Sequence, residues 1–237
     1  MILETLLYPL FLVSIAFSLY AQFKVSSTYK RYSTYYTRAG RNATDIARMI
    51  LSSEGIYNVA IGRVRGNLTD HFDPRSNTLA LSDTTYASTS AAAIGVAAHE
   101  AGHAVQHAVG YLPIKLRSKL VPVTNFASKL SWAFILLGVL LTAISYNVTY
   151  GYYVLMFGIA LFAVTTLFQL VTLPCEFNAS RRAMSALRAS GYYSNDELYA
   201  ARQVLTAAAL TYVAATFASV VQLVRLLVIF GNRNSRR

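Results

Sequence analysis

The pentapeptide His99-Glu100-Ala101-Gly102-His103 constrains this chain more than any other feature. Two histidines four residues apart lie on one face of an α-helix, close enough for both imidazoles to bind one Zn²⁺ ion. The glutamate after the first histidine is turned by about 100°, so it reaches a water at the metal rather than the metal itself. A carboxylate in that place is suited to act as a general base. The alternative interpretation of His99 and His103 is a pair of hydrogen-bonded core histidines.

The residues around the pentapeptide predict a helix over 91–109. The hydroxyls at 88–90 are suitable N-caps, and Gly110 supplies a stop signal. Gly95 and Gly102 lie inside the predicted helix, where each costs about 1 kcal/mol relative to alanine. Together with neighbouring alanines they leave the helix surface shallow, which suits close approach by a substrate or by a second helix.

A third histidine, His107, lies on the same predicted helix. The three histidines spread over about 12 Å of helix, too far for all of them to bind one tetrahedral ion. A metzincin would have its third histidine at the position of Val109, so that class is excluded. We therefore expect His107 to make a polar contact, and the third ligand to come from elsewhere.

Glu176 is the predicted third ligand. It follows Pro174, in the first turn of an expected new helical segment rich in small residues, where it can point into a cleft. The alternative role for Glu176 is to complement the helix dipole. Asp196 and Glu197 are weaker candidates, because with Ser194 they form the pattern of a capping box.

Composition indicates an integral membrane protein. Hydrophobic residues make up 55% of the 237 residues and charged residues 13%, and the mean hydropathy is +0.41. Four apolar stretches reach or approach the roughly 20 residues needed to span a bilayer, at 2–23, 130–146, 152–173 and 204–230. The first lacks a basic leader and carries Glu4, so we expect an anchor rather than a signal peptide.

The positive charges predict the topology. Basic residues form three groups: Lys24, Lys30, Arg31, Arg38 and Arg41; Lys115, Arg117, Lys119 and Lys129; and Arg181, Arg182, Arg188 and Arg202. The connection at 147–151 has none, so all three groups face the cytoplasm if the N-terminus lies outside. His103 and Glu176 then emerge on the same side of the membrane.

The net charge of +11 is attributed to this topology and to contact with anionic lipid, since no nucleic-acid-binding module is recognisable. The single cysteine, Cys175, excludes an intramolecular disulfide.

We expect a mainly α fold with about four transmembrane helices and a small α+β, zincin-like cytoplasmic insert. The predicted parts are a transmembrane anchor (1–23), the insert with the histidine-bearing helix (24–129), two transmembrane helices (130–173), a cytoplasmic helix with the third ligand (174–203), a further transmembrane helix (204–231) and a basic tail (232–237). Inside the insert we expect a helix over 44–53, strand-like segments within 57–68 and 78–82, and a turn between them. The strand at 78–82 is either an ordinary sheet strand or a free edge for an extended peptide.

Longer motifs resemble a known family. The segments 70–75, 91–107, 173–183 and 207–215 resemble the YugP-like family of neutral zinc metallopeptidases, which are bacterial membrane proteins. That family is similar to the HtpX-like membrane gluzincins, in which a glutamate on a later helix completes a His-His-Glu site. Glu176 matches that glutamate. Those relatives usually carry an aspartate one turn later as support for a histidine, where this chain has Ser180. The support is then weaker here or comes from another residue.

These observations predict a multi-pass zinc endopeptidase of the bacterial plasma membrane whose active site faces the cytoplasm. One Zn²⁺ per chain would be held by His99, His103 and Glu176, and Glu100 would act as the general base. The expected partners are a protein or peptide substrate and the lipid bilayer, and no nucleic acid is expected. The candidate oxyanion donors are Arg181, Arg182, Tyr192 and Tyr212. One alternative is a non-catalytic zinc-binding scaffold, which the intact Glu100 disfavours. The other is an intramembrane (site-2-type) protease, which the lack of acidic residues in the last three apolar stretches disfavours.

Overall fold

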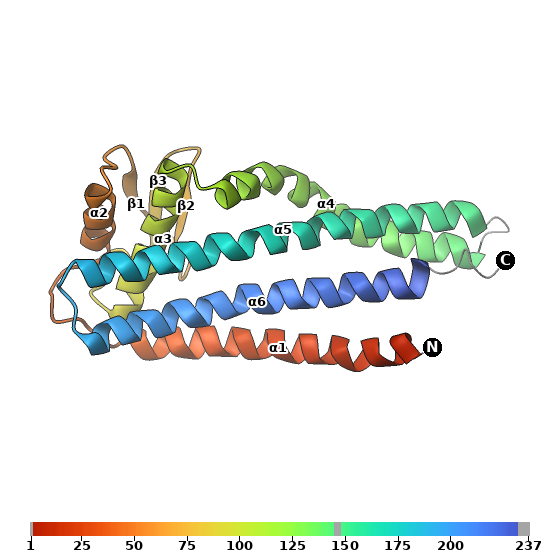
Figure 1. The fold of residues 1–237 in the computed structure, drawn as a ribbon, viewed down its shortest axis with the longest axis horizontal. Helices are drawn as coiled ribbons and strands as arrows, with labels where there is room; N and C mark the ends of the chain where they lie inside the picture. Colours follow the sequence, from red (N-terminus) through yellow and green to blue (C-terminus); the bar gives the residue numbers. More distant parts are fainter. Residues whose placement is uncertain (1, 145–147, 232–237) are drawn as a thin grey trace. The chain divides into compact units, whose positions relative to one another are not determined.

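The fold is described by a computed structural model that covers residues 2–144 and 148–231 (Figure 1). In chain order the elements are α1 (Ile2–Ser33), α2 (Ala43–Ser53), β1 (Ala60–Val64), β2 (His71–Asp73), β3 (Thr78–Ser82), α3 (Ala91–Ala108), α4 (Leu112–Ile144), α5 (Val148–Ala189) and α6 (Asn195–Gly231). The mainly helical class is therefore confirmed. The basic tail predicted at 232–237 and the start of the connection predicted at 147–151 lie outside the described residues.

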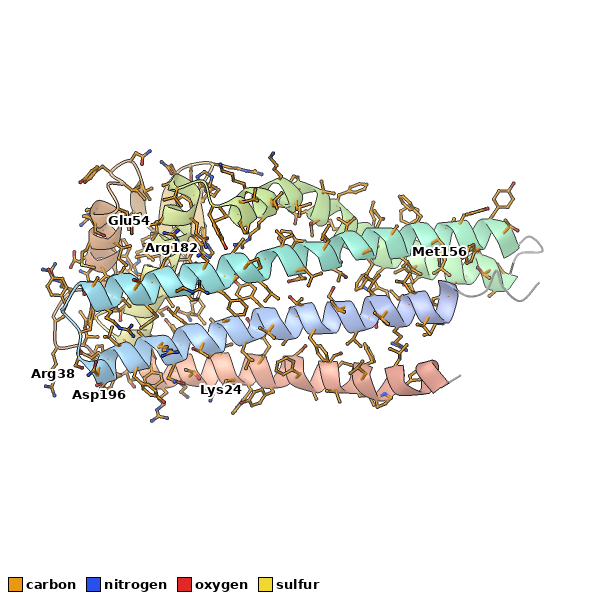
Figure 2. The ribbon with its side chains drawn as sticks, viewed as in Figure 1. Lys24, Arg38, Glu54, Met156, Arg182 and Asp196 are labelled. Atoms are coloured by element: carbon orange, nitrogen blue, oxygen red, sulfur yellow. The ribbon has the colours of Figure 1, made fainter. Side chains whose placement is uncertain are left out.

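Within residues 2–144 and 148–231, four helices are long and apolar enough to cross a membrane, at Leu7–Ser33, Leu112–Ile144, Thr149–Ala189 and Asn195–Gly231. Their most apolar windows have only 11–22% of their residues buried, so most of that surface is free to face lipid. Along α5, Met156 belongs to the apolar half and Arg182 to the polar half (Figure 2). The number of candidate spans agrees with the prediction.

The helices are longer than the apolar stretches from which they were predicted. Helix α5 continues through Pro174, so the expectation that a new helix starts there is wrong. A proline removes one backbone hydrogen bond and usually bends a helix, but tertiary contacts on both sides can preserve it. Glu176 consequently stands in the middle of a long helix rather than in a first turn, which removes the helix-dipole explanation of this residue.

The chain divides into two compact units. The first comprises residues 1–19, 116–173 and 212–237, and the second comprises residues 20–115 and 174–211. In the first unit, Arg225 of α6 lies 4.5 Å from the ring centroid of Phe11 and 5.2 Å from that of Tyr8. These cation–π contacts accommodate a charge within an otherwise apolar helix.

The second unit contains a three-stranded sheet in the order β1-β3-β2. Strand β3 pairs in parallel with β1 and antiparallel with β2, so that both of its edges are occupied. The possibility that β3 offers a free edge to a peptide is therefore wrong. Strand β2 has only three residues, too few for an alternation pattern to reveal it in the sequence.

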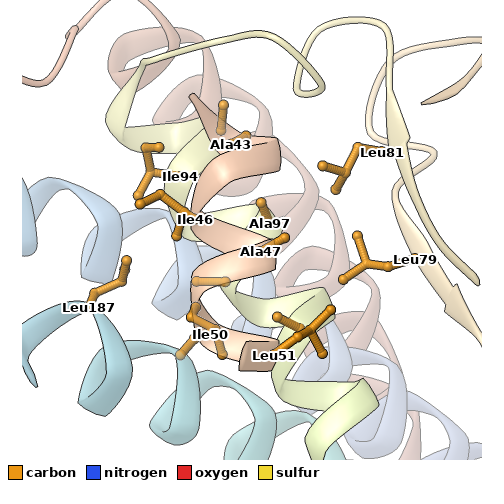
Figure 3. Close-up of a cluster of buried hydrophobic side chains, with 14 of the residues drawn as sticks. Ala43, Ile46, Ala47, Ile50, Leu51, Leu79, Leu81, Ile94, Ala97 and Leu187 are labelled. Carbon is orange, nitrogen blue, oxygen red and sulfur yellow. The ribbon is translucent and has the colours of Figure 1, made fainter. Parts of the chain in front are cut away.

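A buried cluster holds α3 in place within the second unit. Figure 3 shows side chains of α2, β3, α3 and α5 meeting in it. Its leucine and isoleucine members are Ile46, Ile50 and Leu51 of α2, Leu79 and Leu81 of β3, Ile94 of α3, Leu187 of α5 and Leu205 of α6. Burying such aliphatic side chains contributes about 1.5–3 kcal/mol each. The cluster thus fixes the first half of α3 against the sheet and α2.

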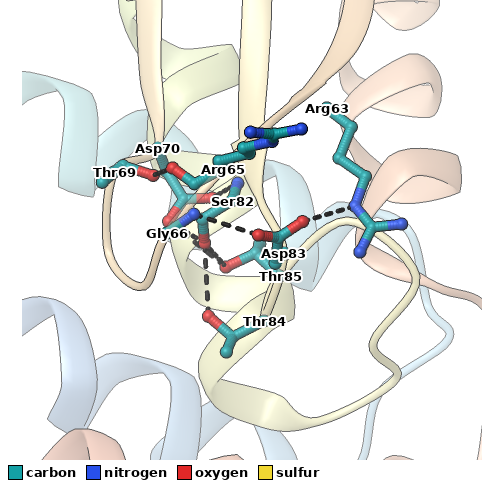
Figure 4. Close-up of polar contacts among 9 residues, drawn as sticks. All are labelled: Arg63, Arg65, Gly66, Thr69, Asp70, Ser82, Asp83, Thr84 and Thr85. Carbon is teal, nitrogen blue, oxygen red and sulfur yellow. Dashed lines mark hydrogen bonds and ion pairs between the residues drawn. The ribbon is translucent and has the colours of Figure 1, made fainter.

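Polar contacts anchor the segment between β3 and α3 (Figure 4). The Asp70 carboxylate accepts hydrogen bonds from the Ser82 backbone N–H at 2.7 Å and the Ser82 hydroxyl at 2.8 Å, and from the Thr85 hydroxyl at 3.2 Å. Asp83 accepts bonds from Arg63 Nε and from the Gly66 backbone N–H. The loop between β1 and β2 is thereby tied to the segment that enters α3.

Glycines bring α3 close to α5 and α6. A Cβ atom at Gly102 would lie 2.7 Å from the backbone oxygen of Ala179 in α5. At Gly95 the corresponding contact, to the backbone oxygen of Ala201 in α6, is 3.4 Å. Of the two uses foreseen for this shallow surface, approach by a second helix is the one observed.

Gly102→Ala should therefore separate α3 from α5. Because the obstructing atom belongs to the backbone, one helix must shift, and overpacking of this kind costs about 1–3 kcal/mol. Thermal unfolding of the full chain in detergent should show a lower midpoint. Gly95→Ala is the matched control, since its Cβ contact is tolerable and alanine is the better helix former by about 1 kcal/mol. Because both variants gain the same helix propensity, equal midpoints for Gly102→Ala and Gly95→Ala would contradict the packing argument.

Candidate metal centre

Three potential ligands converge on one point of the second unit. His99 and His103 lie one turn apart on α3, with ring centroids 4.7 Å apart, and Glu176 reaches them from α5. The Glu176 Oε2 atom is 3.2 Å from His99 Nε2 and 3.6 Å from His103 Nε2. Within the described part of the chain, this is the one group of three or more such residues whose ligand atoms all lie within 4.8 Å of one another.

Burial makes this grouping costly without a cation. Only 1% of Glu176 and 7% of His103 is exposed to solvent. A buried carboxylate needs a positive partner or several hydrogen-bond donors to compensate for lost hydration. A neutral imidazole can donate one hydrogen bond to the carboxylate, whereas a protonated imidazole or a metal ion among the three groups also supplies positive charge.

Ser180 supports His99. Its hydroxyl oxygen lies 3.1 Å from His99 Nδ1, one helical turn beyond Glu176. Ser180 is thus the residue of this chain that supplies the support for His99 left open by the sequence analysis. A hydroxyl carries no charge, so this support orients the ring with a weaker electrostatic effect than a carboxylate would have.

Gln106 supports His103, and its contacts fix the direction of the hydrogen bond. The fully buried Gln106 amide donates through Nε2 to the Cys175 backbone oxygen at 2.8 Å and to Asn178 Oδ1 at 2.9 Å. Its Oε1 atom lies 3.0 Å from His103 Nδ1. Because an amide oxygen only accepts, His103 Nδ1 must be the donor. In a neutral ring, Nε2 then carries the lone pair that faces Glu176.

Arg182 completes this support from α5. Its Nε atom donates to the same Asn178 oxygen, at 3.0 Å. Two donors on one oxygen define which end of the Asn178 amide faces Gln106. Gln106 was not recognised as a site residue from the sequence. Its position three residues after His103, on the same helix face, is the signal that could have identified it.

Glu100 stands beside the ligands on α3 and is half-buried. Burial raises the pKa of Glu100 above its ordinary range, against the effect of the nearby His103 and His99. The charges of Glu176 and Asp70 act in the same direction as burial. These carboxylates together create a negative potential that favours a bound cation.

The rival ligands have other roles. Glu197 is 4% exposed and accepts bonds from the backbone N–H groups of Arg38 at 2.6 Å and Ser194 at 2.7 Å. Ser194 in turn caps α6 through the Glu197 N–H, which confirms the predicted capping box. Asp196 is exposed. His107 packs its ring against Phe72 of β2, at a centroid distance of 6.0 Å, and does not belong to the three-ligand group.

The candidate oxyanion donors are distributed differently. Arg182 is engaged with Asn178, and the Tyr192 hydroxyl accepts a bond from Arg41 at 3.2 Å. Arg181 is exposed on α5, and Tyr212 falls in the first unit. Of the candidate oxyanion donors in the second unit, Arg181 is therefore the one whose side chain makes no hydrogen bond or ion pair with another described residue.

The fold and this site define a helical membrane protein with a possible His-His-Glu metal centre. Comparison with known families places residues 7–231 in the family described as "Putative neutral zinc metallopeptidase", and the chain belongs to that family. It is 42% identical over 221 residues to the Bacillus subtilis (strain 168) protein named "Putative membrane protease YugP". That alignment covers 93% of this chain and 95% of the relative. No solved structure matches the chain.

Gln106→Leu should weaken metal binding with little direct change to the ligands. It removes the acceptor for His103 Nδ1–H, and loss of such a supporting contact typically costs about 10–100-fold in metal affinity. The measurement is the zinc dissociation constant of the full chain, obtained by competition with a chromogenic chelator.

Gln203→Leu provides the matched control, because Gln203 is a half-buried glutamine of the same unit outside this network. Gln106→Glu keeps an acceptor for His103 and should bind zinc more tightly than Gln106→Leu. Unchanged zinc affinity in a folded Gln106→Leu variant would refute the orienting role.

Proposed function

We propose that this chain is a membrane-embedded zinc endopeptidase that cleaves membrane or unfolded proteins. The observation that carries the proposal is the convergence of His99, His103 and Glu176 beside Glu100. Membership of a family described as zinc metallopeptidases supports the same chemistry. The relative from Bacillus subtilis is named as a membrane protease, which agrees with the four apolar helices of this chain.

The donor set fits a single zinc ion per chain. Tetrahedral zinc with bonds of 2.0–2.2 Å requires its ligand atoms to lie about 3.3–3.6 Å apart. The observed separations of 3.2 Å and 3.6 Å from Glu176 Oε2 to the two histidine nitrogens are close to this spacing. Two nitrogens and one oxygen also leave a fourth position open, as in catalytic rather than structural zinc sites.

Each residue has a distinct role in the proposed reaction. When bound, zinc would acidify a water molecule and polarise the peptide carbonyl as a Lewis acid. Glu100 accepts the proton of the attacking water and passes it to the leaving amine. The raised pKa of Glu100 suits this exchange, because a base is most effective when its pKa approaches the working pH. Ser180 and Gln106 hold the rings of His99 and His103, respectively, in a fixed orientation.

A non-catalytic zinc scaffold is the second candidate. A purely structural site favours four protein ligands and needs no general base. The presence of Glu100 next to a three-ligand group therefore favours the enzyme. An intramembrane protease is less well supported, because the three ligands belong to the second unit and not to the one that holds most of the apolar stretches.

Glu100→Gln and Glu176→Gln should separate catalysis from zinc binding. Glu100→Gln retains all three ligands, so it should stay folded and zinc-loaded but lose a factor of about 10² to 10⁴ in rate. Glu176→Gln removes the anionic ligand and should lose zinc and activity together. Elemental analysis and digestion of a peptide library, with and without a chelator, measure both properties.

The scaffold proposal makes the opposite prediction for Glu100→Gln. If the unaltered chain cleaves nothing in peptide and membrane-protein screens while Glu100→Gln restores a deletion strain, the enzyme proposal fails. Loss of zinc in Asp196→Asn, with zinc retained in Glu176→Gln, would instead contradict the ligand assignment.

We also propose that the metal centre faces the cytoplasm of a bacterial cell, with the N-terminus outside the plasma membrane. The distribution of basic residues supports this orientation. Protein substrates and the lipid bilayer are then the partners, without nucleic acid. Soluble or juxtamembrane segments exposed on that side would be the substrates.

Single cysteines test the orientation in a Cys175→Ser background. The exposed positions Arg75, between β2 and β3, and Tyr150, at the start of α5, should lie on opposite sides of the membrane. Tyr150→Cys should react with a membrane-impermeant thiol reagent in intact cells, and Arg75→Cys only after permeabilisation. The reverse labelling pattern would invert the proposed topology.

A further inference from the structure

A groove of about 790 Å³ runs between α5 and α6 in the second unit. Three arginines line it, Arg181 and Arg188 from α5 and Arg202 from α6, while no acidic residue does. Phe177, Met184 and Leu205 contribute apolar surface to the same groove. A ligand for this groove must therefore combine negative charge with apolar groups.

The three guanidinium groups lack internal partners. All three arginines are exposed, and none makes a side-chain hydrogen bond or ion pair with another described residue. Arg182, on a neighbouring face of α5, is by contrast bound to Asn178. Three like charges around one concavity repel one another, and an anionic ligand would relieve that repulsion.

The spacing of the arginines favours an extended chain over a compact anion. Arg181 and Arg188 are seven residues apart on one helix, which corresponds to a rise of about 10 Å. That distance equals about three residues of extended peptide, at roughly 3.3 Å each. Successive acidic side chains of a peptide can contact both positions with the arginine side chains extended, whereas a single phosphate or lipid headgroup requires both side chains to bend toward one point.

The groove also adjoins the metal centre. Ser180 lines the groove and contacts His99 Nδ1 at 3.1 Å. Phe177, which is 42% exposed, lines it too and directly follows the proposed ligand Glu176. A peptide lying in the groove would therefore pass beside the residues proposed to cleave it.

We infer that this groove is a substrate subsite that binds acidic and apolar residues flanking the scissile bond. The inference rests on the proposed peptidase function and specifies its substrate class. Arg181, Arg188 and Arg202 would bind carboxylates, and Met184 and Leu205 would contact the apolar side chains between them. Substrates with glutamate or aspartate near the cleavage site should then be preferred over neutral or basic ones.

Peptide binding tests the inference independently of cleavage. The probe is a fluorescein-labelled octapeptide of leucine and glutamate, compared with the same peptide carrying glutamine, on zinc-loaded full-length Glu100→Gln in nanodiscs of neutral lipid. Replacing all three arginines (R181Q, R188Q and R202Q) should weaken binding of the acidic peptide about tenfold, as expected for three solvent-exposed charge contacts together. Binding of the glutamine peptide should not change.

A triple variant at exposed arginines outside the groove (R48Q, R65Q and R75Q) makes the same change in net charge and should bind both peptides normally. Equal affinity of the groove variant and its parent for the acidic peptide would overturn the inference. So would an arginine dependence that appears only with phosphatidylglycerol nanodiscs, which would identify a lipid site. If the acidic peptide binds through the arginines but the unaltered chain cleaves nothing, the proposed peptidase function fails while the groove assignment stands.

Discussion

The close approach of α3 and α5 is the constraint on which the candidate metal centre depends. Two potential ligands lie on α3 and the third on α5, so the three atoms meet only if the helix backbones almost touch. Gly102 makes this possible, because it lies between His99 and His103 and presents no side chain to Ala179. The sheet, α2 and the buried cluster around Ile46 then serve to hold α3 at that distance.

Hydrogen bonds outside the ligand group add direction to this proximity. A histidine offers two nitrogens, and distance alone does not decide which one carries the proton. Gln106 decides it for His103, since both of its amide hydrogens are already donated to α5. The two bonds donated by Gln106 tie α3 to α5, while its third bond orients the His103 ring, so orientation of the ring and packing of the helices depend on the same residue. A buried amide with unpaired groups would instead be destabilising.

Local patterns in the sequence predict part of this arrangement. The N-cap at Ser90, the helix that follows it and its end before Gly110 are local features, and all are present in the structure. Long-range contacts explain what the sequence did not reveal. The Gln106–Cys175 bond joins residues 69 positions apart, and the continuity of α5 through Pro174 depends on packing that no local rule describes. Strand β2 exists mainly because β3 is available to pair with it.

The distribution of the few acidic residues connects the metal centre with the arginine-lined groove. The chain has 10 acidic and 21 basic residues. Within the second unit, Glu176, Glu100 and Asp70 create the negative potential of the metal centre, and Asp45 and Glu197 occupy helix caps. Asp73 and Asp83 are engaged in a turn and in the ion pair with Arg63. With these carboxylates engaged elsewhere and none lining the groove, its three arginines have no carboxylate partner among the described residues. The chain has few acidic residues, and three of them create the negative potential at the metal centre. The surface next to that centre is therefore positive. A peptide crossing from one to the other would place acidic side chains at the arginines and a peptide carbonyl at the metal centre, which would fix the direction in which it binds.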